Sequence, residues 1–412
     1  MTVLPTEENV QAAKRSVSTG FFLAGITVGT LAPRLAEVKE ATNASVAGYG
    51  TAFAVNALGA LAGFYLGAQA SHRFGSRAVA RTIFFAMITM HFSFSQATNV
   101  YMLTAITVMS GLVYSMFNVN MNSQGVLVEQ RMGRSFLPRA HGAWSLGSLV
   151  GAMGSAAVAP HVSVAYTLGT VDILCGLVWL WMGQGLLKNH FEDSPQIDSS
   201  QLPKSERIPR ITLLFLYVLA LGQAISMLVE GAVGDWSSVL LYEDFKIEIG
   251  PNGYAFVAFS VVHLVTRFFV PKYIDRHGMV KVLKSLSIIG ISGFLAFHFA
   301  ALIMREENKS ITLISSCIAY GFLALGLGAM VPAFASAAGG VVGLPSARAL
   351  MILGTTGAII LWIGRSTFSI FAEMFSLPIA IGGLALLAFI SAYLTKYLDP
   401  KFGEIKGIRA NK

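Results

Sequence analysis

The chain has 412 residues, of which 54% are hydrophobic and only 12% are charged, against about 25% charged residues in soluble domains. With a mean hydropathy of +0.64, it has too few polar side chains to cover a soluble globule of this size, which argues against a soluble enzyme or binding module. The composition predicts an integral membrane protein. The net charge of +8 could indicate nucleic-acid binding, but the placement of the basic residues explains it differently.

The first sixteen residues are polar, and no small-residue cleavage site follows a short hydrophobic stretch. The first apolar run is therefore predicted to be a retained helix rather than a signal peptide. Cys175 and Cys317 both lie in apolar runs and are expected to be small buried hydrophobic residues. Neither a disulfide framework, a metal site nor a cofactor is predicted.

Apolar runs long enough to span a bilayer recur along the whole chain. About twelve spans are predicted, near residues 15–38, 46–70, 78–97, 100–124, 140–160, 164–187, 209–240, 252–273, 279–303, 311–334, 349–373 and 378–397. Residues 188–210, rich in Pro, Ser and charge, divide these spans six and six. We expect an all-α polytopic membrane protein with two pseudo-symmetric six-helix bundles, residues 1–187 and 211–412, joined by a cytoplasmic linker at 188–210.

The basic residues predict the topology. With the N-terminus in the cytoplasm and alternating helices, the cytoplasmic segments hold 22 of the 29 Lys and Arg residues, and the outer segments hold five. This asymmetry follows the positive-inside rule and leaves no need for a nucleic-acid partner. A multi-pass protein of the cell inner membrane with both termini in the cytoplasm is expected.

The two halves of the sequence repeat each other. At an offset of 203 residues, Gly50, Phe53, Arg73 and Gly75 match Gly253, Phe256, Arg276 and Gly278. Together with the six-plus-six layout, this indicates a duplicated transporter whose halves rock about a site at their interface.

Two interhelical loops carry a family resemblance. The stretches H-R-F-G-S-R at 72–77 and D-R-H-G at 275–278 resemble the loop signature of the major facilitator superfamily. The resemblance implies twelve helices in two domains and a conformational role for Arg73, Asp275 and Arg276. His72 stands where an acid is usual and Met279 where a basic residue is usual, so the pattern is incomplete in both copies.

Four further stretches resemble an uncharacterised bacterial inner-membrane subgroup of that superfamily: P-R-L-A-E-V-K-E (33–40), N-S-Q-G-V-L-V-E (122–129), L-P-R-A-H-G-A-W-S-L-G (137–147) and E-G-A-V-G-D-W (230–236). Where the subgroup usually has a proline pair, this chain has Arg365 and Ser366. The resemblance implies solute transport without naming the solute.

Charged residues inside a predicted span cost roughly 2.5–3.5 kcal/mol each on insertion scales. Glu230 and Asp235 share one span, but five residues separate them by about 140° around a helix. They therefore lie on different faces and are not an acid/base pair. Glu230 is predicted to face a cavity, either as a functional group or in a fixed structural ion pair, and Asp235, next to Trp236, is placed near the outer interface.

Polar residues at helical spacing predict a substrate cavity, although the same stripes also suit packing between helices. The cavity candidates are Thr27, Thr30, Asn56, Tyr114, Asn118, Asn122, Trp144, Gln223, Met227, Glu230, His263, Trp362, Arg365 and Ser366. The gate or conformational candidates are Arg34, Arg73, Asp235, Arg267, Asp275 and Arg276. Glu230, Arg365 and Arg34 lie in the outer half and could close an outer gate by ion pairing. Arg267 is either an ionic tie or a contact for an anionic solute.

The sequence thus predicts a secondary active transporter that moves a small solute by alternating access. Desolvation disfavours an ionised carboxylate, so movement of Glu230 between wet and dry surroundings could couple transport to protons. Asp172 is a second proton-coupling candidate, or is paired with a neighbouring helix. The expected partners are a small, sugar-like solute, protons and the lipid bilayer, with a monomeric protein.

Three alternatives remain open at this stage. Met227 and many Phe residues would suit efflux of amphipathic compounds, although G-S-L-V-G-A-M-G in the fifth span lacks the glycine-proline pair of antiporters. A non-transporting receptor or scaffold could use the same fold. An enzyme is disfavoured, since no nucleophile–base pair, metal-ligand spacing or phosphate-binding loop is found.

Overall fold

The computed structural model describes residues 7–133, 136–188, 208–341, 344 and 346–399. In these ranges every regular element is helical and no strand occurs, which confirms the all-α prediction. The chain divides into two compact units. Most of the predicted linker, residues 189–207, lies outside the described residues.

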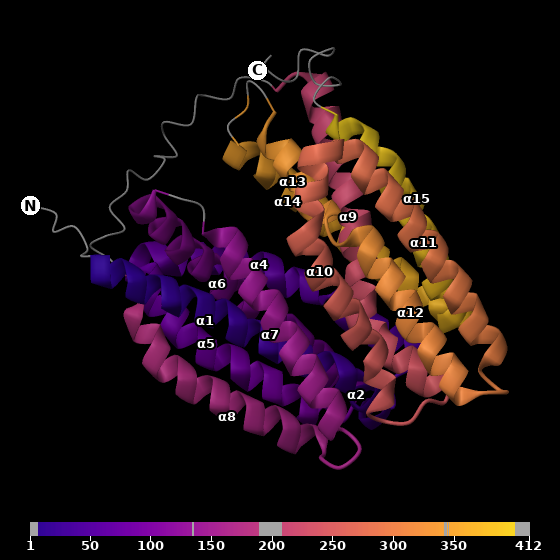
Figure 1. Ribbon diagram of the computed structural model, residues 1–412. Helices are drawn as coiled ribbons and strands as arrows, with labels where there is room; N and C mark the ends of the chain where they lie inside the picture. Colours follow the sequence, from indigo (N-terminus) through magenta and orange to yellow (C-terminus); the bar gives the residue numbers. More distant parts are fainter. Residues whose placement is uncertain (1–6, 134–135, 189–207, 342–343, 345, 400–412) are drawn as a thin grey trace, which may run out of the picture. The chain divides into compact units, whose positions relative to one another are not determined.

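The first unit runs through the described residues up to Lys188 and also takes in Ile249–Gly253. Its helices are α1 (Glu7–Leu31), α2 (Leu35–Thr42), α3 (Val46–Ala54), α4 (Asn56–Phe74), α5 (Ser76–Ser93), α6 (Val100–Met132), α7 (Leu137–Val158) and α8 (Val164–Met182) (Figure 1). Short 3-10 turns follow α1, α5 and α8. Its core is aromatic: Trp179 of α8 lies 5.0 Å from the ring centre of Phe84 and 5.8 Å from that of Phe117.

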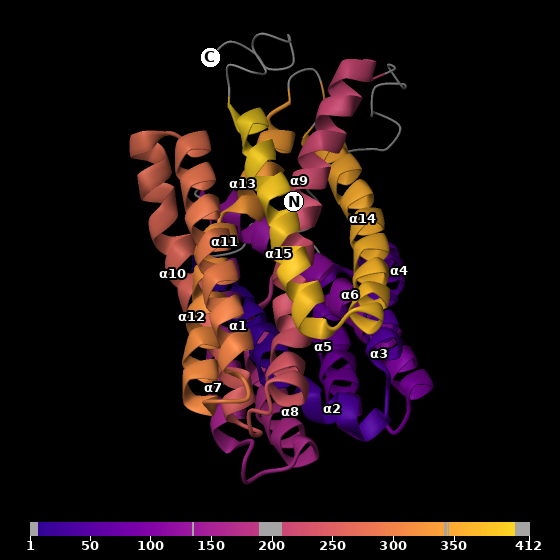
Figure 2. The same ribbon diagram turned by 90° about the vertical axis from the view of Figure 1, so that its right-hand side faces the viewer.

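The second unit contains the remaining helices of the described chain. They are α9 (Arg210–Val239), α10 (Tyr254–His277), α11 (Met279–Met304), α12 (Lys309–Leu327), α13 (Met330–Gly339), α14 (Ser346–Met374) and α15 (Leu377–Leu394) (Figure 2). A π-helical turn, Leu240–Asp244, ends α9. Helices α10 and α11 both pack on α12.

Eleven helical segments in the described residues are long and apolar enough to cross a membrane. Helix α7 is the twelfth; it is long enough at 22 residues, but it carries Arg139 and many small or polar residues, which lower its hydropathy. The prediction of about twelve spans is confirmed. Three predicted spans consist of two helices each: α1 with α2, α3 with α4, and α12 with α13. Helix α6 extends to Met132, eight residues beyond the predicted end, because these residues contain no proline and the left-handed C-cap comes only at Gly133.

Glycines set the distance between helices in the first unit. A Cβ atom at Gly25 would overlap the carbonyl oxygen of Trp144, and one at Gly29 would overlap that of Ser148. From the other side, Gly147 meets the backbone of Phe22 in the same way. Helices α1 and α7 are therefore in backbone contact, as small residues permit in membrane helices. Gly59 and Gly63 bring α4 equally close to α6.

The two units repeat local backbone features at equivalent places. Gly75, between α4 and α5, has φ of 82°, and Gly278, between α10 and α11, has φ of 87°. These left-handed conformations favour glycine, which explains why glycine occupies both positions at the 203-residue offset. Asn99 and Asn308 are the N-caps of α6 and α12, the fourth spans of their units, and each side chain accepts a backbone N–H. The repeated sequence pattern thus corresponds to repeated structure.

We predict that Gly29→Ala destabilises the protein by about 1–3 kcal/mol, the usual cost of overpacking, because its methyl group must push α1 away from Ser148. Gly154→Ala is the matched control: it lies on α7, and outside its own stretch of that helix no heavy atom of the described residues lies within 4 Å of its Cβ position. Thermal unfolding in detergent should show a lower Tm for Gly29→Ala only. Equal melting of the two variants would mean that the contact between α1 and α7 does not limit stability.

Candidate functional site

Helix α9 carries two carboxylates inside a predicted span, and each meets a different neighbouring helix. Glu230 contacts His263 of α10, and Asp235 contacts Arg365 of α14. The two acids are about 140° apart around α9, so a single neighbouring helix does not supply the partner of both. The separation predicted from the sequence is therefore present, and each acid has a basic partner.

The Glu230–His263 pair is loosely held. Glu230 Oε1 lies 3.6 Å from His263 Nε2, and the two side chains are 17% and 10% exposed. That distance is longer than a hydrogen bond, and neither atom has a hydrogen-bond partner within the described residues. The His263 ring stacks on Phe259 at 5.2 Å between ring centres, which fixes its plane. The pair can therefore tighten or exchange a proton after a small movement.

The second pair sits on another face of α9. Arg365 Nη2 lies 3.3 Å from Asp235 Oδ2, and the side chains are 26% and 18% exposed. Gly231 makes room for this arrangement, since a Cβ atom there would be 2.6 Å from Arg365 Nη2. From the sequence we expected Asp235 at the outer interface and Glu230 with Arg365 in one gate. The structure instead pairs Arg365 with Asp235, because the long arginine side chain passes over Gly231 to the residue one turn further along.

The first unit holds a cluster of uncharged polar groups on α6 and α7. The indole N–H of Trp144 donates to the hydroxyl of Tyr114 at 2.9 Å. Further along α6, the Asn122 amide donates to Asn118 Oδ1 at 2.9 Å, and Asn122 Oδ1 lies 3.3 Å from His141 Nε2. These five residues, which we call the α6–α7 polar cluster, present hydroxyl, amide, indole and imidazole groups. Such groups suit recognition of a neutral hydroxylated molecule.

Three predicted cavity residues lie instead in helix contacts of the first unit. Thr27 and Thr30 are only 3% and 1% exposed, and Ser155 of α7 donates to the Thr30 carbonyl. The Asn56 amide donates to the Thr107 carbonyl at 2.8 Å, tying α4 to α6. Thr30 and Asn56 thus take part in ties between helices, whereas the hydroxyl of the buried Thr27 donates to the Ala24 carbonyl of its own helix. Packing of this kind is the alternative that their helical spacing also allows.

The remaining cavity candidates belong to the second unit. Gln223 is buried and donates to the Val331 carbonyl at 3.4 Å. Met227 and Trp362 are 39% and 42% exposed, and the Ser366 hydroxyl donates to the carbonyl of Trp362. Gln223 thus fixes α9 to α13, while Met227 and Trp362 offer accessible apolar surface.

Asp172 of α8 has a partner that sequence spacing could not reveal. Its Oδ1 lies 2.8 Å from His91 Nδ1 of α5, and the side chains are 8% and 6% exposed. The pair is buried and closed, unlike Glu230 and His263. An acid and a histidine 81 positions apart give no local signal, so only the fold brings them together.

The gate candidates are in varied surroundings. Arg34 is fully buried: it forms a bidentate contact with Glu37, and it donates to Thr167 and to the Val162 carbonyl. It therefore anchors the end of α1 and the start of α2 to the start of α8. Arg267 is half-buried on α10, one turn from His263. Arg73, near the end of α4, and Asp275 and Arg276, near the end of α10, are exposed. The Arg73 guanidinium lies 5.2 Å from the ring centre of Phe74.

Among the described residues, no group of three or more His, Cys, Asp and Glu side chains could hold a metal ion. The acid–base pairs and the α6–α7 polar cluster offer groups for proton exchange, ion pairing and hydrogen bonding.

Comparisons with known proteins agree with this architecture. A profile of the Major Facilitator Superfamily matches residues 17–364. Uncharacterized transporter y4wD of Sinorhizobium fredii is 26% identical over 93% of this chain and 97% of its own length. Among solved structures, the nucleoside transporter NupG superposes with a TM-score of 0.67 at 14% identity, covering 95% of this chain and 98% of NupG. A D-xylose-proton symporter superposes with a TM-score of 0.70 at 13% identity, covering 96% and 99%.

We predict that a double-mutant cycle on Asp235→Asn and Arg365→Gln gives a coupling energy of about 1–3 kcal/mol, as contacting groups in one network do. The pair Arg305 and Glu306 is the control, since its side chains are 39% and 75% exposed at 3.6 Å and exposed pairs couple by about 0–1 kcal/mol. Both cycles are measured by denaturant unfolding in detergent. A coupling no larger than the control would show that the ion pair does not join α9 to α14.

Proposed function

The chain belongs to the major facilitator superfamily, and we propose that it is a proton-coupled secondary transporter that moves a small hydroxylated solute by alternating access. It is a member of a transporter family rather than an enzyme. The observation that carries the proton-coupling proposal is the contact between Glu230 and His263, 3.6 Å apart in the largely buried region between α9 and α10.

The charge states of this pair suit proton coupling. With no proton the pair carries −1, with one proton it is neutral overall, and with two it carries +1. Because apolar surroundings disfavour net charge, the singly protonated state is favoured when the pair is dry. When water reaches the carboxylate, which is 17% exposed, ionisation becomes less costly and the proton can leave. A change in hydration between two transport states then moves one proton.

The closed geometry of the second acid–histidine pair supports a different role for it. His91 and Asp172 are already at hydrogen-bond distance and are less exposed than Glu230. We assign Asp172 a structural tie between α5 and α8, although it remains a second candidate for proton coupling. The Asp235–Arg365 pair, which joins α9 to α14, is assigned to gating.

The α6–α7 polar cluster supports the choice of a hydroxylated solute. Its members carry no permanent charge, and Trp144 offers an aromatic face on which a sugar ring can stack. The neighbouring folds of a nucleoside transporter and a D-xylose-proton symporter support solutes of this class. Efflux of amphipathic compounds is the second candidate, favoured by the exposed side chains of Met227 and Trp362.

We predict that purified protein in liposomes, containing a trapped pH dye, moves protons inward when a solute from a panel of pentoses, hexoses and nucleosides is added. Glu230→Gln should abolish solute-driven proton movement but retain solute counterflow, because the neutral side chain keeps its shape and cannot release a proton. Glu306→Gln, an exposed acid of the same unit, is the control and should behave as the unmodified chain.

Two results would contradict the assignment. Solute-driven proton movement that is unchanged in Glu230→Gln would rule out Glu230 as the coupling residue. If the same movement is lost in Asp172→Asn, the coupling residue is Asp172 of the first unit. Proton-driven expulsion of a cationic dye without a response to any member of the panel would favour the efflux alternative.

We also predict that Asn122→Leu weakens binding of the transported solute by about tenfold or more, equivalent to about 1.4 kcal/mol, because it removes both the contact to Asn118 and that to His141. Binding is measured from the ligand-dependent rise in Tm, which follows mass action. Ser123→Ala is the control, since its hydroxyl donates to the carbonyl of Val119 on the same helix. Equal affinity of the two variants for the solute would show that the α6–α7 polar cluster is not part of the binding site.

A further inference from the structure

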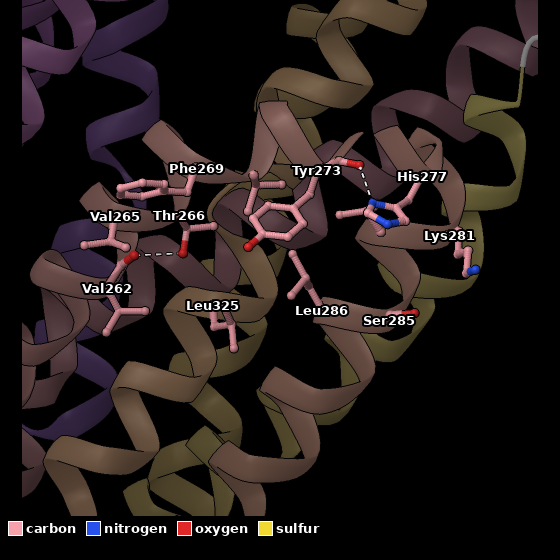
Figure 3. Close-up of a pocket in the computed structure, with 12 residues that line it drawn as sticks. Val262, Val265, Thr266, Phe269, Tyr273, His277, Lys281, Ser285, Leu286 and Leu325 are labelled. Carbon is pink, nitrogen blue, oxygen red and sulfur yellow. Dashed lines mark hydrogen bonds between the residues drawn. The ribbon is translucent and has the colours of Figure 1, made fainter. Parts of the chain in front are cut away.

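The second unit contains an apolar groove that the transport proposal does not use. It encloses about 390 Å³ between α10 and α11, next to the turn that joins them (Figure 3). Its walls include Val265, Phe269 and Tyr273 of α10, Val282 and Leu286 of α11, and Leu325 of α12. The side chains of Val265, Phe269 and Tyr273 are 49%, 54% and 58% exposed, so the groove is open along α10. We call this feature the α10–α11 groove.

The groove exists because α10 and α11 each pack on α12 more closely than on each other. Gly290 of α11 lies against Gly326 of α12, and the Ser287 hydroxyl donates to the Gly326 carbonyl at 2.9 Å. From the other side, the methyl group of Thr266 on α10 lies 3.0 Å from the Cβ position of Gly328. The space between α10 and α11 therefore remains open above α12. The open space results from the glycine contacts that hold α10 and α11 on α12, and not from small side chains in the groove itself.

The two ends of the groove differ in polarity. His277 and Lys281 line the end next to the turn, while Val262 and Val265 line the opposite end (Figure 3). The Thr266 hydroxyl is already bonded to the Val262 carbonyl at 2.8 Å, which leaves the deep end apolar. The exposed residue Arg276 adds positive charge beside the turn, and Asp275 is its one acidic residue. An occupant must therefore be anionic at one end and apolar along its length.

The dimensions fit one leaflet of a bilayer. Val262 and His277 are fifteen positions apart on α10, which corresponds to about 22 Å of helix at a rise of about 1.5 Å per residue. One leaflet has about 15 Å of hydrocarbon and roughly 5–7 Å of interfacial region. The positive-inside rule predicts that the basic end lies at the cytoplasmic surface, where anionic lipids attract basic residues.

From this match we propose that the α10–α11 groove is a binding site for an anionic glycerophospholipid. One acyl chain lies along Val265, Phe269 and Tyr273, and the phosphate contacts Lys281 and His277. A bound lipid would fill the space between α10 and α11 and hold the two helices on α12. Such a site depends neither on the identity of the solute nor on proton coupling.

The test uses the full chain, purified in a neutral detergent and studied by native mass spectrometry and thermal unfolding. The probes are phosphatidylglycerol and phosphatidylcholine with identical acyl chains, and glycerol 3-phosphate, which has the anionic group without chains. Phosphatidylglycerol should bind and raise Tm more than phosphatidylcholine, and glycerol 3-phosphate should do neither at the same concentration.

Variants then locate the site. Lys281→Gln should weaken phosphatidylglycerol binding about fivefold, the effect of about 1 kcal/mol per basic residue near an anionic headgroup, and leave phosphatidylcholine binding unchanged. Lys284→Gln is the matched control, since Lys284 is an exposed residue of the same helix that does not line the groove. Phe269→Ala should weaken binding of both lipids by removing apolar wall.

Four outcomes would overturn the proposal. They are equal binding of the two lipids, equal effects of the Lys281 and Lys284 variants, a full thermal shift with glycerol 3-phosphate alone, and a dimer mass that Phe269→Ala converts to monomer. The third would indicate a simple anion site, and the fourth would make the groove an interface between two copies of the chain.

Discussion

Backbone contact between helices is the constraint on which the placement of the polar groups depends. Lipid gives apolar side chains no reason to prefer one another, so membrane helices associate through close packing and hydrogen bonds. In the first unit, Gly25 lets α1 reach the backbone of Trp144. That contact fixes the stretch of α7 whose indole N–H donates to Tyr114. The α6–α7 polar cluster therefore depends on glycines that contribute no polar group themselves.

Helix α9 shows how one span can serve two electrostatic partners. Glu230 and Asp235 point in different directions, toward His263 of α10 and Arg365 of α14. We propose that the first pair exchanges a proton during transport, whereas the second contains an arginine that stays charged. Loss of a proton from the first pair changes its net charge, whereas the second pair is neutral overall while Asp235 is ionised. The transport cycle proposed above uses both pairs, one to exchange a proton and one as a contact that opens and closes.

Sequence patterns were sufficient to predict the helices but not the side-chain pairs that join one helix to another. Apolar length, glycine positions and the 203-residue repeat predicted the spans and the matching turns at Gly75 and Gly278, because these are local properties of the chain. The pairs His91–Asp172 and Asp235–Arg365 join residues 81 and 130 positions apart, and a helical stripe shows only which face a residue occupies. For the same reason, the sequence could assign a helix face to Thr27, Thr30 and Asn56, but it could not decide whether that face packs on another helix or lines a cavity.

Helix α10 connects two features that are separate in the sequence. His263 lies on one face, and Val265, Phe269 and Tyr273 of the groove each lie 80° or more away from it around the helix, at about 100° per residue. His263, Val265 and Phe269 lie in the same stretch of α10, before Pro271. A displacement of that stretch that tightens the contact of His263 with Glu230 therefore also changes the width of the groove. A lipid that prefers one width of the groove would then affect the proton affinity of Glu230 and His263. Thermodynamic linkage requires that protonation of this pair change the affinity for the lipid by the same factor. The glycine contacts of α12 keep α10 and α11 apart and so create the groove. They are therefore the structural basis by which a bound lipid would change the proton affinity of Glu230 and His263.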